Sequence, residues 1–234
     1  MCGRFVQASA PTLLAEQFDV DELLIENDPP PHYNVAPRME VLTIFERDAR
    51  RLMGQMRWGL VPSWAHDRAV GDRLINARAE TLAEKAAYRH AFERRRCIIP
   101  ADGFYEWQTL PGGKKHPMYI HARSGAPLAL AGIAEAWRDR DDPTAPWVRS
   151  CAVITTDANA TVAPIHDRMP VMLDASDWDL WLDREITEPA AVMPLLVPAP
   201  DDLLELWPVS TRVNAARNDD PTLIEREDPL TLFD

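Results

Sequence analysis

Residues 97–107 read CIIPADGFYEW, and they indicate how the middle of the chain is built. The apolar run at 97–99 and the segment at 103–107 each have the composition of a short β-strand. The sequence PGGK at 111–114 separates the second run from another at 118–121, and this spacing is typical of a hairpin. We therefore predict consecutive short strands here.

Outward from this stretch, the chain mixes strand-like and helix-like segments. Further strands are predicted at residues 41–45, 51–61, 128–133, 147–155 and 204–210. Helices are predicted at residues 11–18, 83–95, 176–182 and 190–196, the third capped by Ser176. The proline-rich residues 28–37 are predicted to be irregular. Because strands and helices do not alternate regularly, we expect an α+β fold on a mainly antiparallel sheet that can close into a barrel.

Length and charge narrow the class of protein. The 234 residues fit one large domain or two small ones, and no linker or repeat divides them. A formal net charge of −12 argues against wholesale nucleic-acid binding but leaves room for a local basic cleft. The chain has no leader-like start and no apolar run long enough to span a membrane, which predicts a soluble cytoplasmic protein with no membrane partner.

The cysteines and histidines give no metal-ligand pattern. Cys2, Cys97 and Cys151 are far apart without a CxxC pair, and the six histidines are scattered. We predict no disulfide framework, no metal site and no cofactor. Cys97 and Cys151 lie in apolar runs and are expected to be buried, as are Trp178 and Trp181 on one face of the predicted helix at 176–182.

The chain begins MCGRF, which offers an unusual reagent if Met1 is removed. Cys2 would then carry a free amine and a thiol on adjacent carbons, with ordinary pKa values near ~7.7–8.0 and ~8.5. Such a pair condenses with an aldehyde to an imine, and the thiol closes a thiazolidine ring. It could equally attack an amide, with the thiolate as nucleophile and the amine as base. A cysteine placed by accident at a frayed terminus is the alternative.

Residues 74–81 read LINARAET, too polar to be core strand throughout. The amide of Asn76 could orient a nucleophile or a substrate oxygen. The planar guanidinium of Arg78 could hold a phosphate. A turn asparagine and solvated charges would give the same pattern, so the segment leaves both interpretations open.

Two further segments carry groups that could move protons. In a strand at 103–107, Phe104 and Glu106 would share one face, with Tyr105 and Trp107 on the other. Desolvation between large aromatic side chains would suit Glu106 to acid/base work, although an outward surface glutamate is equally compatible. His166, in the sequence IHDRMP, could act on a proton or a phosphate, or be structural.

Taken together, these segments resemble the SRAP family, the SOS-response-associated peptidases or abasic-site processing proteins. The matching pieces stand in the family's order: MCGRF, YNVAP at 33–37, WGLVPSW at 58–64, INARAET at 75–81, CIIPADGFYEW at 97–107, AGI at 131–133, IHDRMP at 165–170, and WPVS with VN at 207–214. They span almost the whole chain. Residues 138–147 and 183–202 match least.

The resemblance implies one compact domain over residues 1–234, a distorted barrel of mostly antiparallel strands flanked by short helices, with a polar, acidic segment at 214–234. It also implies a chemistry: covalent crosslinking to abasic sites in single-stranded DNA, which shields them from strand cleavage. By the same resemblance, Cys2 is the nucleophile that forms the thiazolidine after autocatalytic removal of Met1. Asn76 positions Cys2 or the sugar, Glu106 is the acid/base, and His166 helps to open the deoxyribose.

The remaining implied residues bind DNA. Arg4, Arg78 and Arg168 resemble phosphate contacts, Asn34 belongs to the matching YNVAP segment, and Trp64 resembles the aromatic that stacks against nucleobases. We expect a monomer without metal, in the cytoplasm and on damaged DNA in the nucleoid, whose partner is abasic single-stranded DNA.

Three other functions are compatible with parts of this pattern. An N-terminal-nucleophile amidohydrolase, such as a glutamine amidotransferase, also begins MCG, although no glutamine-binding pattern or synthetase portion is found. A processing peptidase would use the same Cys2, and no sequence feature indicates a peptide groove. A non-catalytic single-strand binder would need only the tryptophans and arginines.

Overall fold

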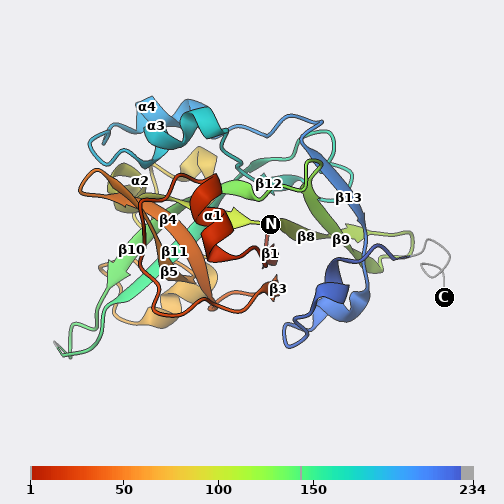
Figure 1. Ribbon diagram of the computed structural model, residues 1–234, viewed down its shortest axis with the longest axis horizontal. Coiled ribbons are helices and arrows are strands. Elements are labelled where there is room, and N and C mark those ends of the chain that lie inside the picture. The colour runs from red at the N-terminus through yellow and green to blue at the C-terminus, as the bar shows by residue number, and fades with distance from the viewer. Residues whose placement is uncertain (1, 143, 228–234) are drawn as a thin grey trace.

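The computed structural model describes residues 2–142 and 144–227. Short helices lie around two sheets, and the start of the chain lies near the middle of the molecule (Figure 1). Met1, whose removal is predicted, and the last part of the acidic segment, 228–234, lie outside the described residues. Within them, no helix is long and apolar enough to cross a membrane.

The larger sheet has eight strands. Its order is β12 (Arg168–Pro170), β11 (Val148–Asp157), β10 (Leu128–Trp137), β7 (Arg96–Ala101), β4 (Glu40–Arg47), β5 (Arg50–Trp58) and β2 (Glu22–Leu23), with β6 (Asn76–Arg78) paired to β11. Most pairs are antiparallel, but β5 also pairs with β11 in parallel. The sequence of pairs β11–β10–β7–β4–β5–β11 therefore closes on itself, which confirms the expected distorted, barrel-like, mostly antiparallel sheet.

The smaller sheet is antiparallel throughout. Its order is β13 (Leu204–Pro208), β9 (Lys115–Ala122), β8 (Gly103–Thr109), β1 (Phe5–Gln7) and β3 (His32–Val35). The sequence CIIPADGFYEW forms β7 and β8, so this single stretch carries the chain from one sheet into the other. Gly103 is required at the crossing, because a Cβ there would lie 2.5 Å from the ring of Tyr119.

The helices are short. The α-helices are α1 (Pro11–Gln17), α2 (Arg89–Arg94), α3 (Trp178–Leu182) and α4 (Pro189–Val192). The 3-10 turns are η1 (Arg68–Arg73), η2 (Ala79–Thr81), η3 (Ala175–Asp177), η4 (Met193–Leu195), η5 (Thr211–Asn214) and η6 (Pro221–Ile224). Helices α3 and α4 lie together at one edge of the molecule (Figure 1). The α+β class is confirmed.

Three local predictions are wrong. The helix expected at 83–95 is restricted to α2, because the N–H groups of Glu84 and Lys85 both turn back to Thr81 O. The cap expected at Ser176 is supplied by Asp174, whose carboxylate accepts from the Ser176 N–H. The region expected to be irregular contains β3, which pairs with β1 along the register Phe5 to Val35.

The core lies inside the barrel and between the two sheets. One cluster of buried side chains joins α2 and α3 to the barrel, and a second holds Cys2 with Phe5, Trp58 and Phe104. The predicted burial of Cys97, Cys151, Trp178 and Trp181 is confirmed. The second cluster forms the wall of the site described next.

Candidate active site

Cys2 lies in the interior, just before β1. Its side chain has no exposed surface and packs in the cluster that contains Phe5 and Trp58, whose rings meet edge to face at 4.9 Å. The thiol points toward Arg4 O, 3.7 Å away. Burial, and then the negative charge of Glu106, raise the pKa of this thiol far above its ordinary value. The thiol is therefore protonated at neutral pH and needs a base in order to react.

Asn76 holds the backbone of Cys2. Its Nδ2 donates to Cys2 O at 2.7 Å, across 74 positions of sequence. The parallel pairing of β6 with β11 places Asn76 beside Val153, and the Tyr88 hydroxyl donates to Asn76 O at 3.0 Å. The Trp58 indole donates to the preceding carbonyl, Ile75 O, at 2.9 Å. Two side chains that the sequence did not single out, Tyr88 and Trp58, thus fix the backbone that carries Asn76.

The second polar atom of the Asn76 amide is unused. Its Oδ1 is buried and accepts no hydrogen bond from the described residues. A buried acceptor without a donor costs about 1–3 kcal/mol, so this atom favours any N–H group that reaches it.

Glu106 comes to the pocket from the smaller sheet. The antiparallel register that aligns Phe5 with Phe104 brings the next inward residue of β8, Glu106, toward the start of the chain. Its side chain is 3% exposed, and its charge acts on the Cys2 thiol. The predicted alternation along β8 is confirmed, because Phe104 packs with Cys2 while Tyr105 packs in a separate cluster.

His166 lies two residues before β12. Its side chain is 30% exposed, and its neighbour Ile165 packs against the cluster that holds Cys2. Nδ1 accepts the backbone N–H of Arg168 at 3.0 Å and lies 2.9 Å from a carboxylate oxygen of Asp167. The structure therefore places His166 next in sequence to a residue that packs against the Cys2 cluster.

Arg4 and Asn34 face the C-terminal segment. Arg4 donates to Asn34 Oδ1 at 2.8 Å and to Val213 O at 2.9 Å. Asn34 is fully buried, and its Nδ2 donates to Val213 O and to Asn218 O. Burial lowers the pKa of Arg4. In this structure both residues predicted to bind DNA use their donors to hold residues 213–218.

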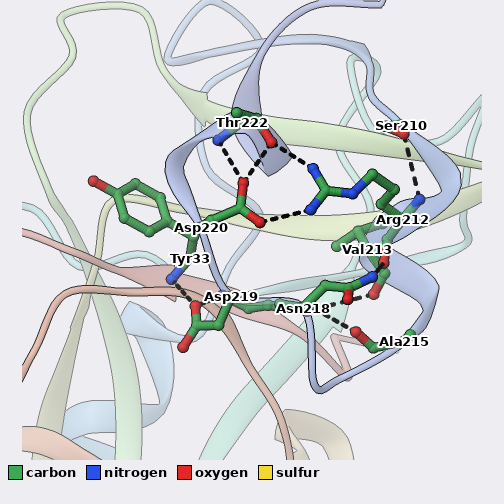
Figure 2. Close-up of polar contacts among 10 residues, drawn as sticks. Tyr33, Ser210, Arg212, Val213, Ala215, Asn218, Asp219, Asp220 and Thr222 are labelled. Carbon is green, nitrogen blue, oxygen red and sulfur yellow. Dashed lines mark hydrogen bonds and ion pairs between the residues drawn. The ribbon is translucent and has the colours of Figure 1, made fainter.

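The segment held by Arg4 and Asn34 is fixed by further hydrogen bonds. Figure 2 shows Arg212 donating to Asp220 and Thr222, and Asp219 accepting the backbone N–H of Tyr33. The Trp207 indole donates to Ile224 O, so the chain folds back onto β13 as far as Glu227, whose N–H donates to Pro208 O.

Arg168 and Arg78, the other two arginines predicted to bind DNA, differ in burial and in ion pairing. Arg168, in β12, is 8% exposed and donates to both carboxylate oxygens of Glu80, at 2.7 and 2.9 Å. It also donates to Asp157 Oδ1 and to Thr155 O, each at 2.7 Å. Hydrogen bonds with Glu80 raise the pKa of Arg168 and lower that of Glu80. Arg78, at the end of β6, is exposed and makes no hydrogen bond or ion pair with the described residues.

Trp64 stands on the surface. Its ring is 50% exposed, and the indole donates to Ala86 O at 3.4 Å. An exposed tryptophan anchored by its N–H presents a flat apolar face to solvent, which is a suitable surface for stacking.

The structure therefore brings Cys2, Asn76 and Glu106 together, and His166 directly follows Ile165, which packs against the same cluster as Cys2. Arg78 and Arg168 lie on the strands that flank β11, since Thr155 pairs with Arg78 and Asp157 with Arg168. The sequence did not predict the strands β6 and β12, because short polar strands show no hydrophobic pattern. It also did not predict that Arg168 pairs with Glu80 and Asp157. The described residues contain no group of three or more His, Cys, Asp or Glu side chains arranged for a metal ion.

Comparison with known proteins places the chain among relatives of similar length. A family model described as SOS response associated peptidase (SRAP) matches residues 1–216. The abasic site processing protein YoqW of Bacillus subtilis is 43% identical, over 96% of this chain and 99% of that protein. The abasic site processing protein YedK of Escherichia coli is 33% identical, again over 96% and 99% of the two chains.

A vertebrate protein and a solved structure are also similar to this chain. The abasic site processing protein HMCES of Xenopus tropicalis is 33% identical over 82% of this chain and 64% of that protein. A crystal structure of a protein from Bacteroides thetaiotaomicron superposes with a TM-score of 0.84 over 97% of this chain and all of that chain, at 24% identity. At this identity the superposition supports the fold only.

Proposed function

The chain belongs to the SOS response associated peptidase (SRAP) family, and from this membership we propose that it processes abasic sites in single-stranded DNA by forming a thiazolidine crosslink through Cys2. The relatives named above carry the words abasic site processing in their names. The observation that carries the proposal for this chain is that Asn76 donates a hydrogen bond to Cys2 O while the charge of the buried Glu106 acts on the Cys2 thiol.

The reaction begins with removal of Met1. Hydrolysis of the Met1–Cys2 bond frees the amine of Cys2. This amine adds to the aldehyde carbon of the opened deoxyribose, and the resulting carbinolamine loses water to become an imine. The thiol then adds to the imine carbon, forming the C–S bond while its proton passes to nitrogen. The sum is aldehyde plus aminothiol giving thiazolidine plus one water.

Glu106 is suited to both proton transfers. As an acid it can protonate the departing hydroxyl of the carbinolamine, and as a carboxylate it can accept the thiol proton during ring closure. The raised pKa of the Cys2 thiol makes the second role necessary, since a protonated thiol is a poor nucleophile. A pocket that excludes water also protects the imine from hydrolysis.

Asn76 sets the position of the reagent. Its hydrogen bond to Cys2 O fixes the carbonyl next to the reacting amine, and its unused Oδ1 is available to an N–H of that amine. His166 would act on the ring oxygen or hydroxyl of the sugar as it opens. Orientation of this kind accounts for a large part of the rate of a two-component reaction.

The DNA strand would be held by few charges. Arg78 is exposed and forms no ion pair with the described residues, so it can meet a phosphate directly, whereas Arg168 would first have to leave Glu80 or Asp157. Stacking of a neighbouring base on Trp64 would add roughly 1–3 kcal/mol. A covalent product persists without tight reversible binding, which reconciles a net charge of −12 with a DNA substrate.

A denaturing gel tests the proposal. The protein is incubated with a single-stranded oligonucleotide carrying one abasic site, then heated in denaturant. We expect a retained adduct with wild type and with Cys97→Ala, a matched buried-cysteine control, and none with Cys2→Ala. A tetrahydrofuran abasic analogue, which has no aldehyde, should give no adduct. A heat-stable adduct in Cys2→Ala would overturn the proposal, and release of ammonia from glutamine would favour the amidohydrolase function instead.

A further inference from the structure

A cavity of about 260 Å³ opens among β4, β5, β7, β10 and β11, and its lining includes none of Cys2, Asn76 and Glu106. Its apolar floor includes Phe45, Met56 and Ala134. Arg149, at the start of β11, stands on its rim, whereas Asn76 of the Cys2 pocket pairs with Val153, in the middle of β11. At ~3.3 Å per residue, Arg149 and Val153 are roughly 13 Å apart along the strand. In Figure 1, the β10–β11 hairpin extends away from the N-terminus.

A second hollow, of about 650 Å³, continues from the first. It shares Arg95, Ala136 and Arg149 with the cavity and extends along the β10–β11 hairpin to Trp147. We call the two together the arginine groove. Its arginines, besides the buried Arg96, are Arg47, Arg95, Arg138, Arg140, Arg149 and Arg184.

Few of these positive charges form ion pairs. Among the described residues only Arg95 of the six is ion-paired, with the buried carboxylate of Glu135. Arg47, Arg149 and Arg184 are exposed and form no ion pair there. The pKa of Arg95 is lowered by burial and then by the charge of Arg184, so the two guanidinium groups repel each other. The lining as a whole carries an excess of positive charge, because its carboxylates are those of Glu46, Glu135 and Asp139 only.

The groove also carries an aromatic surface. Trp147 is 60% exposed, and the guanidinium of Arg138 lies 4.8 Å from its ring centroid. Arg140 donates to Ser63 O at 3.3 Å, and Ser63 directly precedes the exposed Trp64. A stacking surface with arginines on either side, continuous with Trp64, matches the phosphates and bases of a single DNA strand better than it matches an acidic peptide.

We propose that the arginine groove is a second binding site, which holds the phosphodiester backbone and one base of the single-stranded DNA that flanks the lesion. The choice of DNA as ligand rests on the proposed function; the anion-binding character does not. A DNA strand that leaves the Cys2 pocket past Trp64 would reach the groove along Ser63 and Arg140. The site would lengthen the bound stretch of DNA without taking part in the chemistry.

Reversible binding of lesion-free oligonucleotides, one short and one long, followed by fluorescence anisotropy over a series of salt concentrations, tests the proposal. For the long oligonucleotide, Arg47→Ala/Arg149→Ala should lower the affinity about tenfold and make the salt slope shallower by about 1.4, since each lost contact to a single strand contributes about 0.7. The short oligonucleotide should bind both proteins alike. The matched control Arg123→Ala/Arg226→Ala removes two exposed arginines outside the groove and should leave the affinity for the long oligonucleotide within about twofold.

Trp147→Ala separates DNA from other anions. It should weaken binding of the long oligonucleotide about tenfold without changing the salt slope, because stacking releases no counterions. Equal losses in the groove and control double variants, no loss in either, or full binding by Trp147→Ala would each overturn the proposal. Because the oligonucleotides carry no lesion, their binding is measured apart from crosslinking, so failure of the crosslinking chemistry and failure of the groove give different results. Melting temperatures confirm that each variant is folded.

Discussion

The Cys2 pocket and the arginine groove lie at different positions along β11 and are built in opposite ways. In the pocket, polar groups are few: the buried thiol of Cys2, the buried carboxylate of Glu106 and the half-buried amide of Asn76, beside an apolar cluster. In the groove, charged groups are many and exposed, and only Arg95 of its six open arginines has a carboxylate partner among the described residues.

This contrast between the two sites suits the Cys2 pocket to catalysis and the arginine groove to binding. A buried, preorganised pocket changes the properties of its groups, as the raised pKa of the Cys2 thiol shows, and this favours chemistry. Exposed arginines bind an anion through their charge, which salt screens. The net charge of the whole chain therefore does not indicate the local charge of either site. A substitution in one of the two regions should therefore leave the function of the other unchanged.

The largest effect is expected from Glu106→Gln. This change keeps the shape of the side chain but removes the group that transfers protons, so the crosslinking rate at saturating DNA should fall about 100-fold or more. Reversible binding of long lesion-free DNA should not change. Glu205→Gln, an equivalent change in β13, serves as the control and should react like wild type. An equal rate in Glu106→Gln and wild type would remove proton transfer from this residue.

Asn76→Asp should have the next largest effect. Aspartate has the same shape but no N–H to donate to Cys2 O, and it adds a second negative charge near Glu106. We expect the single-turnover crosslinking rate to fall about 10- to 50-fold, the result of losing about 1.5–2.5 kcal/mol of positioning. Asn214→Asp keeps the acceptor oxygen used by Trp107 and should have no effect on this rate. If both variants react normally, Asn76 does not position Cys2.

Arg168→Ala should act on stability first. Its removal leaves Glu80, Asp157 and Thr155 O without their shared donor at the junction of β11 and β12. Because both carboxylates are substantially exposed, we expect a loss of about 1–2 kcal/mol in the free energy of unfolding, measured by urea denaturation. An unchanged stability together with weaker DNA binding would instead make Arg168 a direct phosphate contact.

Arg78→Ala provides the contrast. This arginine is exposed and has no ion-pair partner within residues 2–142 and 144–227, so its loss should leave stability unchanged. The crosslinking rate at subsaturating DNA should fall about three- to tenfold at low salt, and the difference from wild type should shrink as salt rises. A rate that matches wild type at every salt concentration would exclude Arg78 from the site.

The smallest effect concerns pH. The Cys2 thiol has a raised pKa in the folded protein, so above its ordinary pKa the unfolded chain loses this proton while the folded chain keeps it. The associated stability is present at neutral pH and is lost as the pH rises. From about pH 8 to about pH 9, wild type should lose about 0.5–1 kcal/mol more than Cys2→Ala, as measured by urea denaturation. Parallel losses would show that the thiol is not buried in solution.

The sequence predicts those features that depend on local pattern. The strands of the barrel and the hairpin between β8 and β9 follow from apolar runs and a glycine-rich turn. The alternation of Phe104 and Glu106 against Tyr105 places Glu106 beside Cys2 once the register is known. The strand β3 escapes prediction because its pairing with β1 and the hydrogen bond that the Tyr33 N–H donates to the Asp219 carboxylate outweigh the local proline content.

The site residues also differ in how far the sequence alone predicts their contacts. The reactivity of Cys2 can be read from its position in the chain, but its hydrogen bond to Asn76 depends on β6, a three-residue strand with too few residues to show a pattern. The roles of Asn76 and His166 came from the resemblance to the family. The pairing of Arg168 with Glu80 and Asp157 arises only when β6 and β12 flank β11, so sequence could not reveal it.

Intact mass spectrometry of the purified protein, before and after exposure to abasic single-stranded DNA, tests the central claim most directly. We predict that the protein lacks Met1, and that its mass then rises by the mass of the oligonucleotide minus one water, a change absent from Cys2→Ala. A protein that keeps Met1, or that gains the same mass without Cys2, would contradict the claim that a terminal aminothiol captures the lesion.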